Sequence, residues 1–579
     1  MSSEDDFRVR PGRIRSRPKE RAKPFIAQAL AAAQRAGGDV RRNGRIAAPR
    51  SSRFGRGRTA TVQANRLLTS RTRLSTVKTR IVRQSARRSS LGAHLSYLRR
   101  EGVTRDGEKA HMFGPETDDV DVMGFTERCE DNRHHFRFII SPEDAAEMSS
   151  LRGFTGDLMR QVEKDLGTQL DWIGVDHWNT DNPHVHVILR GRADDGKDLV
   201  IARDYISHGM RGRAQDLITQ ELGPRSDLEI RHSLQSQIDA ERWTQLDRQL
   251  ERDAKRNGII DVAPEPHRQP DEFLPQKVGR LRKLESLGLA RQLGPGQWLM
   301  VDEAEVTLRA LGERGDIFKR MHRALAERGI ERSAASYVLA GESLGDRIAG
   351  RLLDRGLDDE VKGTAYAVVD GVDGRIHHIK LLDLDAAGDG AVGSIVELRR
   401  FNDARGRSRV ALAVRSDLDT EAQVNASGAT WLDRQLLAGD RAAFGASGFG
   451  AEVQAAMNAR ADHLVDQGFA RRKGRQVIYM RNLLDTLRRR ELEAAGEQFS
   501  AEIGTPFQKA ASGEYVAGVY RQRLILASGR FAMIDDGLGF RLVPWAPSLE
   551  RNLGKHVSGV VRPDGGIDWS FGRKRSLGI

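Results

Sequence analysis

The sequence predicts an α+β protein whose main domain is a largely antiparallel sheet with helices behind it. Two observations predict this domain: short segments between positions 76 and 190 alternate apolar and polar residues, and segments with helical apolar stripes lie between them. A third observation, the uneven charge, sets the N-terminus apart. We therefore expect a disordered basic arm at 1–75, the sheet domain at 76–240 and further modules behind it.

The N-terminal arm is rich in arginine and interrupted by Gly, Ser and Pro. The first 90 residues hold 24 Lys/Arg against 5 Asp/Glu, whereas the net charge of the whole chain is only +13, so the rest of the chain is slightly acidic. This composition is typical of disordered segments. We expect the arm to contact phosphates without sequence preference.

Simple sequence patterns argue against several classes of protein. No run approaches the roughly 18 apolar residues of a membrane span, and no signal-peptide core is present. A single cysteine in 579 residues excludes a disulfide framework. A Walker A phosphate-binding signature is absent, which argues against an ATP-driven helicase. The sequence predicts a cytoplasmic protein without membrane insertion.

Three histidines fall within ten residues, at His177, His184 and His186. The flanking segments 171–176 and 185–189 have strand patterns, and the loop composition of 179–183 predicts a hairpin. Side chains at i and i+2 of a strand share a face, so the last two histidines project together and the hairpin can bring His177 beside them. Three neutral imidazoles facing one point form a site for a divalent metal with positions left open.

Two upstream segments carry further candidates. A helix around 91–102 would bury Leu91, Leu95 and Leu98 and leave Tyr97 off that stripe. In the segment 134–144, alternating apolar residues predict a strand, and Ser141 followed by proline predicts the N-cap of a helix running to about Gly167. A helix N-terminus offers free N–H groups to a phosphate, although Ser141 could also serve as a simple cap.

Together these segments resemble the motifs of the HUH endonucleases, in particular the conjugative relaxases whose tyrosine precedes the histidines. The resemblance rests on Leu95-Ser-Tyr-Leu-Arg-Arg, on the strand ending at Ser141, and on Pro183-His-Val-His. Two positions depart from the pattern, because Asn179 stands where Asp is usual and Arg190 where Asn is usual. The first departure leaves Asp176 or Asp181 as the carboxylate that would support His177.

The resemblance implies an HUH-type palm and a nicking reaction. The enzyme would cut and religate one DNA strand at a transfer origin, with Tyr97 forming a 5′-phosphotyrosine and His177 also catalytic. The ordinary pKa of tyrosine is about 10, and Mg²⁺ or Mn²⁺ on the three histidines would favour the phenolate. By ligand softness, Zn²⁺, Co²⁺ or Ni²⁺ are alternatives. DNA or phosphate contacts are expected at Ser141, Arg137 and Arg190.

The resemblance also implies partners and a location. The partners would be single-stranded and supercoiled DNA at the transfer origin, accessory relaxosome proteins and a type IV coupling protein, with translocation of the bound strand into a recipient cell. Two alternatives stay open. Tyr205, which follows the histidines, would suit a rolling-circle replication initiator or a transposase. A non-enzymatic DNA-binding regulator would use its histidines for a structural metal or for none.

The segments behind the sheet domain are predicted from charge and an internal repeat. A charged helix over 226–258 and the prolines at 264, 266, 270 and 275 predict a helix end and linker at 241–276. Residues 284–300 align without gaps to 464–480, with six of 17 positions identical. Each copy predicts a helix ending at Gly288 or Gly468 and then a hairpin, a pattern typical of winged-helix modules.

We therefore expect winged-helix-like modules at 277–345 and 416–505. Glycine-rich, strand-patterned stretches follow each copy and predict β-rich modules at 346–415 and 506–579, as small barrels of SH3 or OB type. A basic cluster at 572–576 is a candidate for recognition by a secretion apparatus.

Overall fold

The computed structural model describes residues 39–40, 46–47, 71–83, 91–99, 104–105, 108–178, 182–254, 258–263, 271–339, 348–359, 362–403, 406–438, 444–562 and 566–570. Its residues divide into two compact units, one comprising 1–78, 101–120 and 138–316 and the other 79–100, 121–137 and 317–579. Within the predicted arm only a short pair, β1 (Asp39–Val40) with β2 (Ile46–Ala47), and the residues from 71 onward are described. The predicted disorder of the arm and the basic cluster at 572–576 thus lie outside the described residues.

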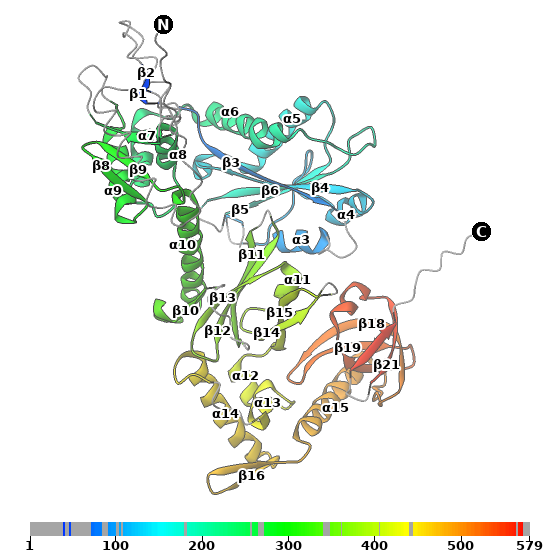
Figure 1. Cartoon of the computed structure of the whole chain (residues 1–579). Helices are drawn as coiled ribbons and strands as arrows, with labels where there is room; N and C mark the ends of the chain where they lie inside the picture. The colour runs from blue at the N-terminus through cyan, green and yellow to red at the C-terminus, as the bar shows by residue number, and fades with distance from the viewer. Residues whose placement is uncertain are drawn as a thin grey trace, which may run out of the picture. The chain divides into compact units, whose positions relative to one another are not determined.

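A four-stranded sheet confirms the strands predicted for the main domain (Figure 1). Its order is β3-β4-β6-β5, with bounds β3 (Ser75–Arg83), β4 (His134–Pro142), β5 (Trp172–His177) and β6 (His184–Arg190). The last two strands form the predicted antiparallel hairpin. Both strands are almost completely buried.

The helices described within the span 76–240 are α3 (Leu91–Leu98), α4 (Val122–Glu130), η1 (Ala145–Glu147), α5 (Leu151–Leu166), the π-helical turn η2 (Tyr205–Gly209) and α6 (Met210–Leu222). The predicted start of a helix at Ser141 is wrong, since Ser141 and Pro142 belong to β4. The helix begins nine residues later, where the Ser150 side chain accepts from the N–H of Gly153. Its end at Gly167, in the left-handed region with φ 66°, is as predicted.

The region after the sheet domain holds two separate helices instead of the predicted single one. α7 (Asp227–Gln237) starts with a capping box between Ser226 and Glu229, and α8 (Gln245–Ala254) follows a break. These helices continue into β7 (Ile260–Asp261), α9 (Leu274–Ser286), β8 (Ala290–Gly294), β9 (Gln297–Met300) and α10 (Ala304–Ala326). The three strands form one sheet of order β7-β9-β8.

α8 and β7 belong to the same helical module as α9 and the β8–β9 hairpin. Leu250 of α8 and Ile260 of β7 share a buried core with Leu281 and Leu284 of α9 and with Trp298 of β9. The predicted helix end within 241–276 corresponds to α8, and the bounds of the linker stay a prediction. Three of its prolines lie outside the described residues, and the fourth stands at the start of α9.

The second unit contains two β-rich modules and a second helical module. The first β-rich module is a sheet of order β10-β13-β12-β11-β14-β15, comprising η3 (Ala334–Ser336), β10 (Tyr337–Val338), β11 (Ala349–Asp359), β12 (Thr364–Gly371), β13 (Ile376–Leu381), α11 (Leu384–Ala387), β14 (Ile395–Asn402) and β15 (Ser408–Ser416). The last module is a sheet of order β20-β19-β18-β21-β22, comprising β18 (Tyr515–Leu526), β19 (Gly529–Asp535), β20 (Phe540–Pro544), η5 (Pro547–Asn552), β21 (His556–Val561) and β22 (Ile567–Ser570).

These two sheets repeat one connection pattern. In the first sheet the long bulged strand β11 pairs with β12 and with β14, and the short helix α11 precedes β14. In the last sheet the long bulged strand β18 pairs with β19 and with β21, and the short helix η5 precedes β21. The β-rich character predicted for both regions is confirmed, and closure into small barrels stays a prediction.

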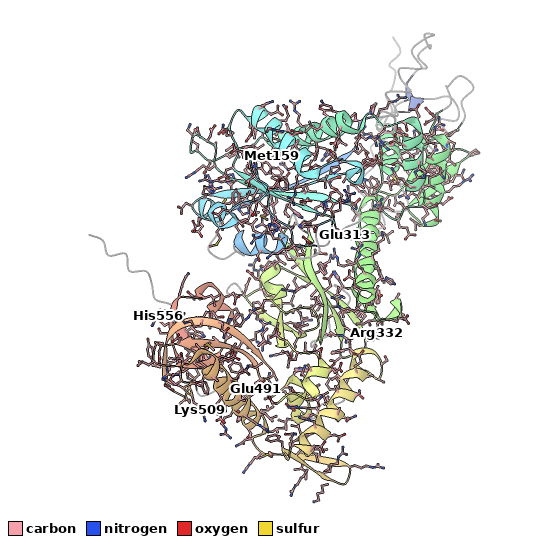
Figure 2. The ribbon with its side chains drawn as sticks, turned by 180° about the vertical axis from the view of Figure 1, so that it is seen from behind. Met159, Glu313, Arg332, Glu491, Lys509 and His556 are labelled. Carbon is pink, nitrogen blue, oxygen red and sulfur yellow. The ribbon has the colours of Figure 1, made fainter. Side chains whose placement is uncertain are left out.

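In the sequence, the second helical module lies between the strands of the two sheets. It consists of α12 (Thr420–Val424), α13 (Trp431–Ala438), α14 (Gly448–Asp466), the hairpin β16 (Ala470–Lys473) with β17 (Gln476–Tyr479), and α15 (Leu483–Ile503). Glu491 of α15, labelled in Figure 2, is buried and accepts from the N–H groups of Ala527 and Ser528 at the β18–β19 turn. That contact fixes α15 to the last sheet.

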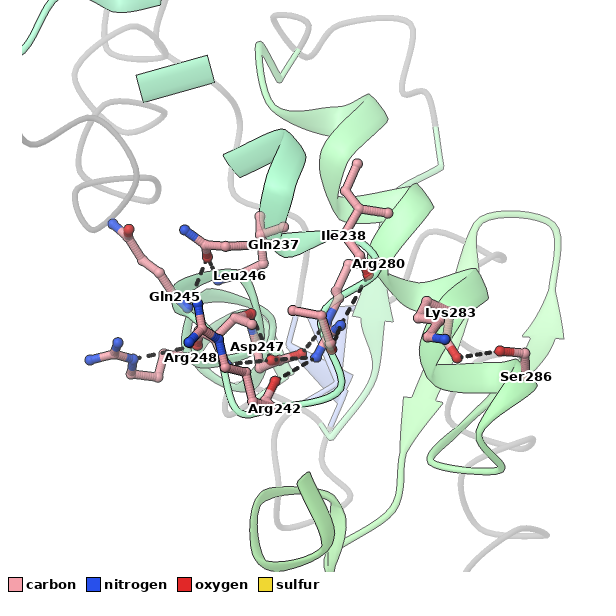
Figure 3. Close-up of polar contacts among 12 residues, drawn as sticks. Gln237, Ile238, Arg242, Gln245, Leu246, Asp247, Arg248, Arg280, Lys283 and Ser286 are labelled. Atoms are coloured by element: carbon pink, nitrogen blue, oxygen red, sulfur yellow. Dashed lines mark hydrogen bonds and ion pairs between the residues drawn. The ribbon is translucent and has the colours of Figure 1, made fainter. Parts of the chain in front are cut away.

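Each helical module is built around one completely buried arginine. In the first module the Arg280 guanidinium donates to both carboxylate oxygens of Asp247, and the neighbouring residues are drawn in Figure 3. It also donates to three backbone carbonyls, those of Ile238, Ala240 and Arg242.

The second module repeats these five contacts. Arg460 donates to both oxygens of Asp433 and to the carbonyls of Val424, Ala426 and Gly428. The internal repeat therefore extends well upstream of the aligned 17 residues. The ungapped alignment itself fails inside the hairpin, because Ala290 lies opposite Met300 whereas Ala470 lies opposite Tyr479.

Candidate metal centre

The β5–β6 hairpin places the three histidines on one face of the sheet. His177 lies directly opposite His184, and His186 lies opposite Val175. Because directly opposed residues share a face and side chains alternate along each strand, the three imidazoles project to the same side. The predicted juxtaposition of His177, His184 and His186 is confirmed.

The three rings pack against one another. Their centroids lie 5.5 Å apart for His177 and His184, 4.5 Å for His177 and His186, and 4.9 Å for His184 and His186. One ligand nitrogen from each ring lies within 4.8 Å of the others. All three side chains are buried. Among the residues that the structure describes, this cluster can hold a metal ion.

The hydrogen bond at Nδ1 of His184 indicates which nitrogen of that ring could bind a metal. Its Nδ1 lies 2.9 Å from the carbonyl oxygen of Asn182, which can only accept, so Nδ1 carries the proton. In the neutral ring Nε2 is then the unprotonated nitrogen, which is the form that binds metals, and it lies 3.2 Å from Nε2 of His186. Two nitrogens bound at about 2.1 Å to one ion lie about 3.0–3.4 Å apart. The donor set therefore fits a divalent cation.

Of the two carboxylates expected to support His177, the structure describes Asp176. Asp176 is next to His177 in β5, and consecutive strand residues point to opposite faces. Its two oxygens accept from Arg152 Nε at 2.9 Å and from Trp178 Nε1 at 2.7 Å. Asp176 is thus engaged on the other face of the hairpin. Asp181 lies outside the described residues.

Tyr97 lies on α3 as predicted, off the buried stripe of Leu91, Leu95 and Leu98. Its hydroxyl oxygen accepts from the backbone N–H of Leu357 in β11 at 3.0 Å. This close approach needs Gly356, since a Cβ there would lie 2.4 Å from the Tyr97 hydroxyl oxygen. Tyr97, Gly356 and Leu357 belong to the same compact unit.

The contact with β11 was missed by the sequence analysis. Leu357 is 260 positions from Tyr97, and the only local signal is a glycine within a strand pattern. Such a glycine often marks a place where another group approaches the backbone closely, but it does not say which group.

Tyr205, the alternative nucleophile, is bound to a carboxylate. Its hydroxyl donates to Asp165 at 2.7 Å, and Arg213 donates to both oxygens of the same carboxylate. Burial, followed by the bond to Asp165, raises the pKa of Tyr205 well above its ordinary value. The Arg213 guanidinium lowers the pKa of Asp165 to about 2, so this carboxylate is charged at neutral pH.

Each residue that was expected to bind phosphate makes a polar contact within the protein. The Ser141 hydroxyl donates to the carbonyl of Pro183, next to His184, at 3.3 Å. Arg137 Nε donates to His135 Nε2 at 3.1 Å, and burial lowers the pKa of His135 to about 3, with a further contribution from Arg137. Arg190 lies 3.5 Å from the carboxylate of Asp171.

Comparison with known proteins identifies a protein family. The family model described as "Protein of unknown function (DUF3363)" matches residues 277–408 and 397–578, together more than half of the chain. No curated protein and no solved structure matches the chain. None of the helices among the described residues has the length and apolar character needed to cross a membrane.

Proposed function

The chain belongs to the DUF3363 family, and we propose that it is a metal-dependent DNA relaxase, a single-strand endonuclease and transesterase that starts conjugative transfer. The observation that carries this proposal is the buried cluster of His177, His184 and His186 on one face of a β-hairpin. It is supported by the resemblance of the segments around Tyr97 and the histidines to conjugative relaxases.

In the proposed reaction Tyr97 loses its phenol proton to solvent, and its oxygen attacks a phosphodiester phosphorus of one DNA strand. The P–O bond to the 3′ oxygen breaks, the 5′ phosphate stays on Tyr97, and the 3′ oxygen takes a proton to become a hydroxyl. Reversal of the same step reseals the strand. A divalent ion on the histidines, with Mg²⁺ or Mn²⁺ the preferred candidates, would polarise the phosphate and stabilise negative charge.

This chain's own residues prepare that chemistry in two ways. The Asn182 carbonyl holds the Nδ1 proton of His184 and so presents Nε2 as a ligand, a contact of the kind that orients metal-binding histidines. The N–H of Leu357 points at the Tyr97 oxygen. A backbone donor at that position stabilises the negative charge of the phenolate form of Tyr97.

The hydrogen bond from Tyr205 to Asp165 disfavours the hypothesis that Tyr205 is the nucleophile. A tyrosine whose hydroxyl donates to a charged carboxylate must leave that partner, and its raised pKa opposes the phenolate. A rolling-circle initiator or transposase of that kind is therefore the weaker candidate.

The decisive experiment incubates the purified full chain with supercoiled DNA that carries the transfer region of its own mobile element. Reactions contain Mg²⁺ or Mn²⁺, or EDTA, and denatured products are tested for protein on the 5′ end. Wild type is compared with Tyr97→Phe, Tyr205→Phe and His186→Ala. His135→Gln serves as the control, because His135 is a buried histidine outside the cluster.

We expect a metal-dependent nick with covalent 5′ protein that is lost in Tyr97→Phe and His186→Ala and kept in Tyr205→Phe and His135→Gln. Loss of the adduct only in Tyr205→Phe would move the protein to the initiator class. Tight duplex binding without an adduct in any variant would instead favour a DNA-binding regulator.

A further inference from the structure

The two helical modules share a buried framework but differ in the hairpin that follows the central helix. In the first module, β7 pairs with β9, so the hairpin is part of a three-stranded sheet. Gln297 and Trp298 of this hairpin are buried. In the second module, β16 and β17 form a two-stranded ribbon among the described residues. In Figure 1 this ribbon joins the ends of α14 and α15.

The two hairpins also differ in charge. Residues 470–481 contain five Lys/Arg and no Asp/Glu, whereas the equivalent stretch 290–302 contains Arg291 and Asp302 and is neutral. Because both hairpins follow the same buried framework, the positive charge is not needed to build the fold. It is an addition specific to the second module.

The ribbon is amphipathic across its two faces. Val477 and Tyr479 are partly buried and pack with Phe469 against the core of the second helical module. Arg471 lies opposite Ile478, and Lys473 opposite Gln476, so these side chains occupy the other face. All four are exposed. The apolar face therefore anchors the ribbon and leaves its cationic face in solvent.

Most of these cations have no carboxylate to neutralise them. Arg472 pairs with Asp462. Among the residues that the structure describes, no ion pair involves Arg471, Lys473 or Arg475. Arg475 stands in the turn next to Gly474, whose φ is 61°. Three like charges thus lie on the exposed part of one short hairpin.

We infer that the β16–β17 ribbon of the second helical module binds the phosphate backbone of duplex DNA through Arg471, Lys473 and Arg475. A two-stranded β-ribbon is one of the two protein elements that the major groove of duplex DNA admits. The turn carries glycine and arginine and no large apolar side chain for insertion into a membrane. The inference rests on the proposed function only for the choice of DNA among polyanions.

The test measures equilibrium binding of the full chain to a short duplex of random sequence at several salt concentrations, with EDTA present throughout. Each phosphate contact contributes about 0.9 to the slope of log K against log salt. We expect the triple variant Arg471→Ala/Lys473→Ala/Arg475→Ala to lower the slope by about 3 and to weaken binding near 0.1 M salt on the order of 10²-fold. Because EDTA prevents metal-dependent nicking, this binding measurement does not depend on whether the chain has the proposed nuclease activity.

The control removes three exposed cations from the first copy and the helices around it, as Arg282→Ala/Arg291→Ala/Lys319→Ala. This variant has the same net charge as the test variant, and we expect it to keep the wild-type slope. Equal slopes for the wild type and both variants would overturn the inference. So would loss of binding to phosphatidylserine vesicles in the test variant with an unchanged duplex slope, because the ribbon would then serve a membrane surface. Matching thermal unfolding of both variants and the wild type excludes misfolding as the cause.

Discussion

Replacing Arg280 by lysine tests whether the buried arginine organises the first helical module. Arg280 and Asp247 are both completely buried. The guanidinium makes five hydrogen bonds: two to the carboxylate at 2.8 and 2.9 Å, and three to the carbonyls of Ile238, Ala240 and Arg242 at 3.0, 2.6 and 3.0 Å. Lysine keeps the charge but has three N–H donors instead of five.

The magnitude follows from the acceptors that lose their donor. At least two of the five contacts are lost, and a buried acceptor without a partner costs about 1–3 kcal/mol. Arg280→Lys should therefore lower the free energy of unfolding by about 2–6 kcal/mol. Arg280→Ala would leave the Asp247 carboxylate buried and uncompensated, at a cost of about 3–5 kcal/mol or more.

Urea unfolding followed by circular dichroism and tryptophan fluorescence measures the effect. The matched variant is Arg460→Lys, which removes the same contacts from the second module. Because the two arginines lie in different compact units, each variant should shift a different part of the unfolding curve. Arg282→Lys, on an exposed position of the same helix as Arg280, should change stability by less than about 0.5 kcal/mol.

An Arg280→Lys protein that unfolds at the same urea concentration as the wild type and as Arg282→Lys would refute this reasoning. It would mean that the fork geometry of the guanidinium does not hold the segment before α8 in place.

Three further predictions concern the candidate site and the second unit. Gly356→Ala should reduce nicking on the order of 10–100-fold with little change in DNA binding. The reason is that the new Cβ would lie 2.4 Å from the Tyr97 hydroxyl oxygen and displace it. Unchanged nicking in single-turnover assays would argue against Tyr97 as the nucleophile or against this placement. Mn²⁺ at about 100 times its Kd should stabilise the chain by about 2.7 kcal/mol, measured as a rise in the thermal midpoint, and His186→Ala should abolish that rise; an equal rise in this variant would place the ion elsewhere. Burial, and to a lesser degree Arg320, lowers the pKa of His378 to about 4, so between pH 6.5 and 4 the unfolded chain takes up a proton there that the folded chain does not. The stability from this histidine is therefore complete above pH 6.5 and falls by about 1.4 kcal/mol per pH unit toward pH 4; His378→Gln should make the pH dependence of urea unfolding shallower in that window, and an unaltered dependence would contradict the assignment.

The sequence by itself determined the local elements and the identity of the candidate ligands. Alternation and loop composition located the hairpin of His177, His184 and His186, because the period of a strand dictates which side chains share a face. The stripe of α3 likewise placed Tyr97 at its edge. The repeat announced two related modules, since the hairpins and the residues before them are similar in sequence.

Only the tertiary structure decided the contacts between segments that are distant in sequence. A serine followed by proline fits a helix start equally well as a strand end, and at Ser141 pairing in the sheet prevailed over the local capping signal. Asp176 was a reasonable partner for His177 by position, but the alternation of the strand turned it to the other face, toward Arg152. The hydrogen bond from Leu357 to Tyr97 and the buried arginine of each helical module depend on burial and on precise donor geometry, and neither quantity is encoded in local periodicity.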